Sequence, residues 1–220
     1  MTSRGLRGAL LGALVLAVPA CTACSASGDG QSGTVAVSSS AAAIPSATSG
    51  LAALLLSDVP SGLPRVPDDE LDPPAGRKSV QDVAGYAPDA EHQRQVLEDY
   101  GYRWGWERFW RTGDQLTSVF LDQFRALDGA AAYADDLARN DAEYYGGVPD
   151  RTPAGLPAGC TLLTVDVPGP QARLAGPAAF AWCASGVFTV SVAAVSTSPS
   201  AARAEVEAVT VQQLDRLPAG

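Results

Sequence analysis

The densest group of side chains with recognition chemistry is a run of aromatic residues with arginines between the rings. It comprises Tyr100, Tyr102, Trp104, Trp106, Phe109 and Trp110, separated by Arg103, Arg108 and Arg111. On a β-strand, alternate side chains share a face, so Tyr102 and the three tryptophans are predicted to lie together. Two interpretations stay open: the rings pack a core between a sheet and helices, or they form an open wall that stacks a sugar, lipid or peptide while Arg108 holds an anionic group.

Residues suited to acid–base or metal chemistry are scarce. The single histidine, His92, lies in an acidic helical stretch and is expected to be a solvated surface residue, so the commonest general base is missing. A His-based zinc site is disfavoured because there is no second histidine and the cysteines are assigned to other roles. The acids within residues 68–72 lack the turn glycine of a calcium-binding loop. We therefore expect no catalytic residue, no metal and no cofactor.

A carboxylate-based hydrolase is the weaker alternative, and it would depend on acids such as Glu107. Glycosidases show the arrangement that this chemistry needs, which is a pair of carboxyl groups flanking the scissile bond. Two carboxylates converging in one cleft would therefore favour an enzyme.

The four cysteines divide into two pairs by position. Cys160 and Cys183 fall in predicted strands and are expected to form a structural disulfide worth about 3 kcal/mol in a compartment that permits oxidation. A catalytic dithiol would usually appear as Cys-x-x-Cys opening a helix. Only Cys21 and Cys24 have that spacing, and they lie near the start of the chain.

The first twenty residues have the pattern of a secretory signal. Arg4 and Arg7 precede an uncharged, mostly apolar stretch over residues 8–20, which is shorter than the roughly 20 residues that span a bilayer. It ends in the sequence VPAC, at Cys21, and resembles the bacterial lipobox, in which the cysteine thiol takes a diacylglycerol group. Two acyl chains anchor a protein stably. An ordinary secreted protein, cut near residues 25–27, is the alternative.

The expected organisation is a signal peptide over residues 1–20, a lipidated flexible tether over 21–50 and a single α+β domain over 51–220. The tether is rich in small residues, which cannot bury enough apolar area to offset the entropy of ordering. Strands are predicted over 100–111, 116–124, 160–167, 178–185 and 187–196, and helices over 79–99, 128–140 and 198–217. Two strand-strand-helix-like halves predict an antiparallel sheet with helices packed on one face.

The charge balance restricts the partners. The chain carries a net charge of −9, and removal of the signal peptide takes away two arginines and no acid. Nucleic-acid binding depends on clustered Lys and Arg, so no nucleic acid is expected as a partner. An acidic chain is also repelled by anionic headgroups, so membrane residence has to come from the anchor on Cys21.

Several of these features together resemble a broad group of actinobacterial exported lipoproteins. They are the lipobox, the Ser/Ala/Gly tether, the leucine run before Asp58, and Gly101-Tyr102 leading into an aromatic strand. The continuation from Phe120 (FLDQFRALDGAAAYADDL) is similar as well, since those proteins pair an apolar strand ending in Phe with a Gly-Ala-Ala helix start. The resemblance covers most of residues 51–220. It implies an α+β envelope domain of a largely uncharacterised group, and it supplies no catalytic residues.

The sequence thus predicts a non-enzymatic binding or accessory lipoprotein on the extracytoplasmic face of a bacterial cell membrane. Its ligand is expected to be a hydrophobic or glycan-like envelope molecule or a partner protein, with Tyr102, the three tryptophans and Arg108 as candidate site residues. A structural or sensor-like interaction domain without a small-molecule pocket is the main alternative. A concave pocket lined by the tryptophans would favour ligand binding, and a flat exposed patch would favour a protein partner.

Overall fold

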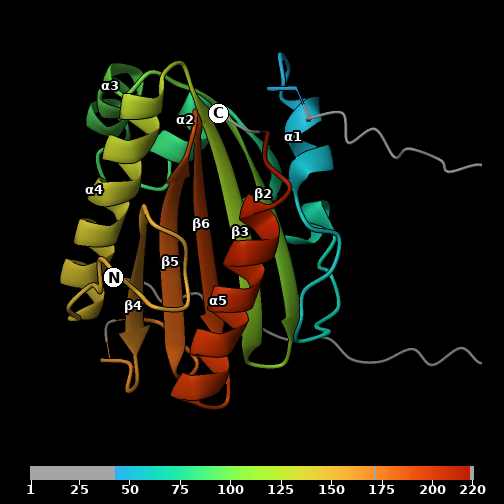
Figure 1. The fold of residues 1–220 in the computed structure, drawn as a ribbon, viewed down its shortest axis with the longest axis vertical. Coiled ribbons are helices and arrows are strands. Elements are labelled where there is room, and N and C mark those ends of the chain that lie inside the picture. Colours follow the sequence, from blue (N-terminus) through green and yellow to red (C-terminus); the bar gives the residue numbers. More distant parts are fainter. Residues whose placement is uncertain (1–42, 171, 219–220) are drawn as a thin grey trace, which may run out of the picture. The chain divides into compact units, whose positions relative to one another are not determined.

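Apolar side chains recurring along the strands build one six-stranded antiparallel sheet with the order β1-β2-β3-β6-β5-β4 (Figure 1). The computed structural model describes residues 43–170 and 172–218, so the predicted signal peptide, Cys21 and Cys24 lie outside the described residues. The strands are β1 (Gly76–Lys78), β2 (Tyr102–Thr112), β3 (Gln115–Phe124), β4 (Cys160–Val165), β5 (Ala178–Ser185) and β6 (Phe188–Val195). The predicted α+β class with an antiparallel sheet is confirmed.

Five α-helices accompany the sheet in the described residues. They are α1 (Ser49–Leu54), α2 (Val80–Ala84), α3 (Ala90–Asp99), α4 (Leu127–Tyr145) and α5 (Pro199–Leu214), with a short 3-10 helix at Asp68–Glu70. The Ser198 hydroxyl caps α5 by accepting from the Ala201 amide, and Gly146 ends α4 in the left-handed conformation at φ 75°. Within the described residues, no helix has the length and apolar character needed to cross a membrane.

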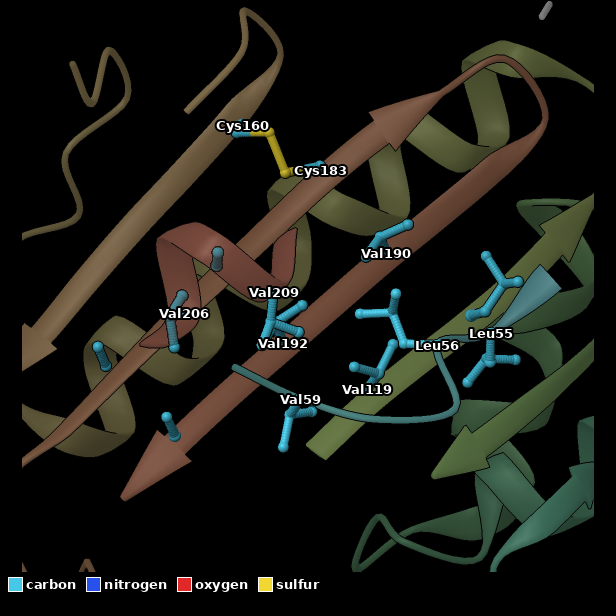
Figure 2. Packing of buried hydrophobic residues seen from close by; sticks show 14 of the residues in the cluster. Leu55, Leu56, Val59, Val119, Cys160, Cys183, Val190, Val192, Val206 and Val209 are labelled. Atoms are coloured by element: carbon cyan, nitrogen blue, oxygen red, sulfur yellow. A yellow bond between two sulfur atoms is a disulfide. The ribbon is translucent and has the colours of Figure 1, made fainter. Parts of the chain in front are cut away.

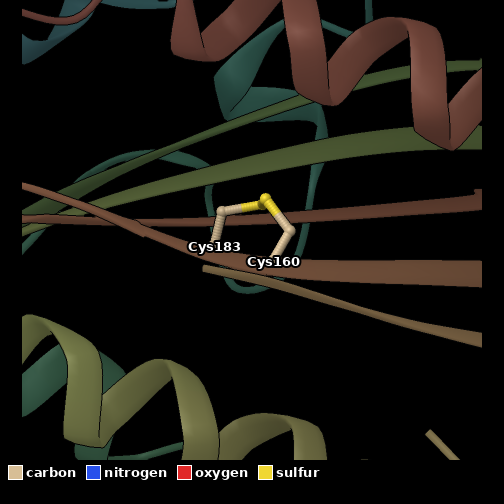
Figure 3. Close-up of a disulfide and its surroundings, with 2 residues drawn as sticks. All are labelled: Cys160 and Cys183. Carbon is tan, nitrogen blue, oxygen red and sulfur yellow. A yellow bond between two sulfur atoms is a disulfide. The ribbon is translucent and has the colours of Figure 1, made fainter. Parts of the chain in front are cut away.

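The helices lie on both faces of the sheet, which corrects the prediction that they pack on one. Figure 3 shows α5 on one side of the strands and α4 on the other. The cause is visible in β5, where Ala181 and Cys183 face α5 while Phe180 and Trp182 face α4. A strand whose successive side chains are all apolar requires cover on both sides. We call these two sides of the sheet the α5 face and the α4 face.

The larger core lies on the α5 face (Figure 2). Leu55, Leu56 and Val59, from the segment that follows α1, belong to the same buried cluster as Val119 of β3 and Val206 of α5. Helix α1 contributes leucines to this core, and α5 contributes alanine and valine side chains. This core fixes α1 and α5 on a common surface.

Polar contacts hold the C-terminal end of α1 against this core. The buried Gln213 side chain donates to the Leu54 carbonyl at 3.0 Å and accepts from the Leu56 amide at 3.1 Å. The chain is also held ahead of α1, because Gln123 Nε2 donates to the Pro45 carbonyl at 3.0 Å. Ordered packing thus includes residues before 51, and the rest of the predicted tether, residues 21–42, lies outside the described residues.

The predicted disulfide between Cys160 and Cys183 is confirmed (Figure 3). The two cysteines are direct partners across β4 and β5, and both are buried on the α5 face. The bridge closes a sequence separation of 23 residues and ties the edge strand β4 to the sheet.

Candidate functional site

The aromatic run of β2 is divided between the two faces of the sheet. Trp104, Trp106 and Trp110 lie on the α5 face, whereas Tyr102 packs with Phe124 on the α4 face. The prediction that Tyr102 shares a face with the tryptophans is therefore wrong. Tyr102 lies on the other face because the β2–β3 pairing is irregular between Tyr102 and Trp104. This irregularity shifts the alternation of side chains by one residue.

On the α5 face, the predicted site residues make contacts within the protein. Trp110 is 1% exposed and its indole donates to the Ser57 carbonyl at 3.2 Å. The buried Arg108 guanidinium donates to the carbonyls of Leu55 and Leu56 at the end of α1. Trp104 and Trp106 are partly buried against the same core. The contacts of Arg108 and Trp110 position the C-terminal end of α1. A ligand-binding role for these two residues and for Trp104 and Trp106 stays a prediction.

A pocket of about 280 Å³ lies on the α4 face. The strands contribute Glu107, Ser118, Phe120, Asp122, Phe180, Trp182, Ser191, Val192 and Ala193. The helical side contributes Val83 and Tyr86 from α2 and the turn after it, and Tyr133, Leu137, Asp141 and Tyr145 from α4. We call this space the α4 pocket.

The sequence of α4 explains why a space remains between helix and sheet. Residues 133, 137, 141 and 145, which line the pocket, are spaced by four and form one stripe along the helix. A neighbouring stripe of alanines, including Ala134, Ala138 and Ala142, packs against the strands. The alanines bring one edge of α4 close to β4 and β5, while the larger side chains border the open space over β3 and β6. The small residues Ser191 and Ala193 of β6 leave that space unfilled.

Aromatic rings form the wall of the pocket on the β5 side. Tyr145 stacks on Phe180 with ring centroids 4.6 Å apart and an interplanar angle of 19°. Phe180 in turn lies nearly parallel to Trp182, at 5.9 Å and 8°. This series joins α4 to the sheet and gives the pocket a rigid apolar side.

A buried ion pair borders the opposite side of the pocket. Lys78, the only lysine of the chain, is 3.0 Å from Glu107 Oε2, and the Tyr86 hydroxyl donates to Glu107 Oε1 at 2.7 Å. Burial raises the pKa of the Glu107 carboxyl, and the hydrogen bonds from Tyr86 and Lys78 oppose that rise. Burial and the bond to Glu107 raise the pKa of Tyr86. Both oxygens of Glu107 are therefore held in fixed positions.

Asp122 is the second acid of the pocket, and its partner is Tyr102. The Tyr102 hydroxyl donates to Asp122 Oδ1 at 3.0 Å, and Asp122 is 6% exposed. Burial raises the pKa of Asp122 to about 7; the bond from Tyr102 opposes this rise, and the charge of Glu107 adds to it. The carboxyl group thus titrates near neutral pH.

The third acid, Asp141, projects from α4 and has no hydrogen-bond or ion-pair partner among the described residues. Burial raises its pKa to about 6. Ser191 also belongs to the pocket lining, and its hydroxyl is buried and likewise has no hydrogen-bond partner in the described part of the chain. Polar groups that face a pocket without a protein partner are the ones available to a ligand or to water.

The arrangement can bind a molecule with both apolar and polar parts, and its acids can exchange protons near neutral pH. In the described residues, no group of three or more His, Cys, Asp or Glu is arranged to hold a metal ion. Sequence reasoning named Glu107 as a candidate acid and missed Asp122 and Asp141. The signal that could have found Asp141 is the spacing of four between Tyr133, Leu137, Asp141 and Tyr145.

No family model matches the chain, and no curated protein matches it. One solved structure with a similar arrangement is the extracellular domain of PknH from Mycobacterium tuberculosis, with a TM-score of 0.44 and 13% sequence identity. The alignment covers 79% of this chain and 97% of that one. A likeness at this level says nothing about what this chain binds.

Proposed function

We propose that the chain is a non-enzymatic, extracytoplasmic binding domain that holds a small amphipathic ligand in the α4 pocket. The observation that carries the proposal is the placement of three acids, Glu107, Asp122 and Asp141, in an aromatic-lined cavity. Burying carboxyl groups is energetically costly, and a space needed only for packing would be filled by apolar side chains. Apolar pockets with a few convergent polar groups and shifted pKa values are typical of binding sites.

The proposed location rests on other residues. The buried Cys160–Cys183 bridge suits an oxidising compartment outside the cytoplasm. The signal pattern and the lipobox at Cys21 support export followed by attachment to the cell membrane through lipid. In this proposal, the anchor supplies the membrane contact and the domain supplies the binding site.

A thermal-shift screen tests the binding function. The chain from residue 21 onward, with Cys21 replaced by serine, is tested against envelope lipids, glycans and amines. A pocket ligand raises the Tm of this protein and fails to raise that of Ala193→Phe, whose ring fills the pocket. Ala132→Phe makes the same substitution on the exposed side of α4 and is the control. A ligand that stabilises all three proteins equally would contradict binding in the α4 pocket.

An acid–base hydrolase is a second candidate, because carboxyl groups do converge in one cleft. The pKa values of about 7 for Asp122 and about 6 for Asp141 suit a general acid near neutral pH. Binding remains the preferred function because both oxygens of Glu107 are hydrogen-bonded and Asp122 accepts from Tyr102. Turnover of chromogenic glycosides or esters that disappears in both Asp122→Asn and Asp141→Asn would favour the hydrolase.

A further inference from the structure

We infer that the α4 pocket takes an organic cation, a protonated amine joined to an apolar body of about one ring, with Asp141 as its counter-charge. The inference rests on the proposed binding function and narrows its ligand from any small amphipathic molecule to one charge class. Four features of the pocket support it: the signs of its charges, its aromatic wall, its unpaired acceptors and its size.

The charged groups that line the pocket are all acids. Glu107, Asp122 and Asp141 belong to the lining, and no described Lys or Arg side chain does. The nearby Lys78 is already paired with Glu107. An anionic ligand would meet acids with no free cation, and a neutral ligand would leave the Asp141 carboxylate unpaired. A cation provides the missing charge.

The aromatic wall adds a second attraction for the same class of ligand. Tyr145, Phe180 and Trp182 form a stacked series that borders the pocket. A cation over an aromatic face is attracted by the negative potential of the ring, and the attraction strengthens when water is excluded. Asp141 and Tyr145 are four residues apart on α4, so the carboxylate and the first ring of the series lie on the same side of the helix.

The unpaired acceptors match the donors of an ammonium group. A primary ammonium carries three N–H donors. Asp141 has no partner in the described residues, and the buried Ser191 hydroxyl has none either. Asp122 accepts one bond, from Tyr102, among the described residues. The lining of the pocket thus contains acceptors from α4, β3 and β6.

The size of the pocket limits the rest of the ligand. A volume of about 280 Å³ is close to the lower end of small-molecule sites, which hold roughly 300–1,000 Å³. Benzylamine and benzyl alcohol are suitable probes because they share a ring and a methylene group and differ in charge at neutral pH. A comparison of the two isolates the contribution of the cation.

The test is a calorimetric titration of both probes into the chain from residue 21 onward, carrying Cys21→Ser, at pH 7.5. We expect benzylamine to bind at least tenfold more tightly than benzyl alcohol. Asp141→Asn is expected to reduce that preference about tenfold, and it leaves the fold intact because Asp141 makes no hydrogen bond or ion pair to described residues. Glu143→Gln removes an exposed carboxylate from the same helix and is expected to leave the preference unchanged.

Equal affinities for the two probes, both lost in Ala193→Phe, would overturn the cation inference and leave the proposed binding function standing. A preference for benzylamine that survives Asp141→Asn would also overturn the inference, because the charge would then be recognised elsewhere. If neither probe binds, the inference fails, while the thermal-shift screen with Ala193→Phe still decides whether the pocket binds another class of molecule.

Discussion

Gly105 is the residue that makes room for the buried polar pair of the pocket. It lies opposite Asp122 in the β2–β3 ladder, and a Cβ atom at this position would be 2.2 Å from Asp122 Oδ1 and 2.6 Å from the Tyr102 hydroxyl oxygen. Both contacts are too short to exist, so a side chain at residue 105 has to displace the carboxyl group or the ring.

Gly105→Ala is therefore expected to lower the free energy of unfolding by about 2 kcal/mol, within the range for overpacked cores. In an ordinary strand position, the same substitution would stabilise slightly. Urea denaturation measures the effect. Gly169→Ala is the control, because a Cβ at that position meets no atom within 4 Å. Equal free energies of unfolding for the two variants would show that Asp122 and Tyr102 adjust to the added Cβ without loss of stability.

Asp122 should make stability depend on pH. Its pKa is raised to about 7 in the folded protein, above the ordinary value of 3.8, because the carboxyl group is buried and lies near the charge of Glu107. The folded state then holds a proton that the unfolded state has lost. The contribution of Asp122 to stability is full below about pH 4 and is lost as the pH rises through 7.

Asp122→Asn keeps an acceptor for the Tyr102 hydroxyl and removes this titration. We expect the variant to gain stability relative to the wild type between pH 4 and pH 8, on the order of a few kcal/mol. Chemical denaturation at a series of pH values measures it, with Glu143→Gln as the control for net charge. If the free energies of unfolding of the variant and the wild type differ by a constant amount over this pH range, Asp122 is not the source of the pH dependence.

At the scale of elements, the docking of α1 onto α5 depends on Gln213. Its amide satisfies the Leu54 carbonyl and the Leu56 amide inside the core, where no solvent replaces a lost partner. Arg216 also donates to the Leu54 carbonyl, at 2.9 Å, so the Leu56 amide depends most on Gln213.

Gln213→Ala is expected to lower the free energy of unfolding by roughly 2 kcal/mol, the usual range for leaving buried polar groups unsatisfied. The adjacent Gln212 is exposed, so Gln212→Ala makes the same chemical change without touching the contact. Guanidinium denaturation compares the two. A loss of the same size in both would mean that helix propensity, not docking, is responsible.

The elements also show what could and could not be predicted from the sequence. Alternation and turn residues located five strands within a few residues, and the pairing of Cys160 with Cys183 was predicted correctly. The placement of helices on one face was wrong because β5 is apolar on both sides, a pattern that requires cover on both faces of the sheet. The position of Tyr102 was wrong because a bulge in β2 breaks the period of two.

The candidate site was harder to predict than the fold. Buried acids such as Asp122 have the same sequence signature as surface acids, and only the tertiary structure places them beside aromatic rings from distant segments. Glu107 comes from β2, Asp141 from α4 and Trp182 from β5, and no local motif links the three. Their convergence depends on both β-sheet register and helix packing.

At the scale of the whole molecule, the proposed lipid anchor at Cys21 is separate from the proposed binding domain. Expression of the full chain in a bacterial host that processes lipoproteins should place it in the membrane fraction, and Cys21→Ser should prevent that attachment. Cys24→Ser is the control and should stay membrane-bound. Membrane association of the Cys21→Ser protein equal to that of the wild type would contradict a lipid anchor at this residue.

A proton–nitrogen NMR spectrum of the tryptophan indoles, recorded during titration with benzylamine, shows directly which face of the sheet binds the ligand. The four indoles are assigned by single Trp→Phe substitutions. Only Trp182 lines the α4 pocket, whereas Trp104, Trp106 and Trp110 lie on the opposite face of the sheet. We predict that the Trp182 resonance shifts in a saturable manner and that the other three do not. Shifts of Trp104 or Trp106 with Trp182 unchanged would place binding on the α5 face and contradict the account.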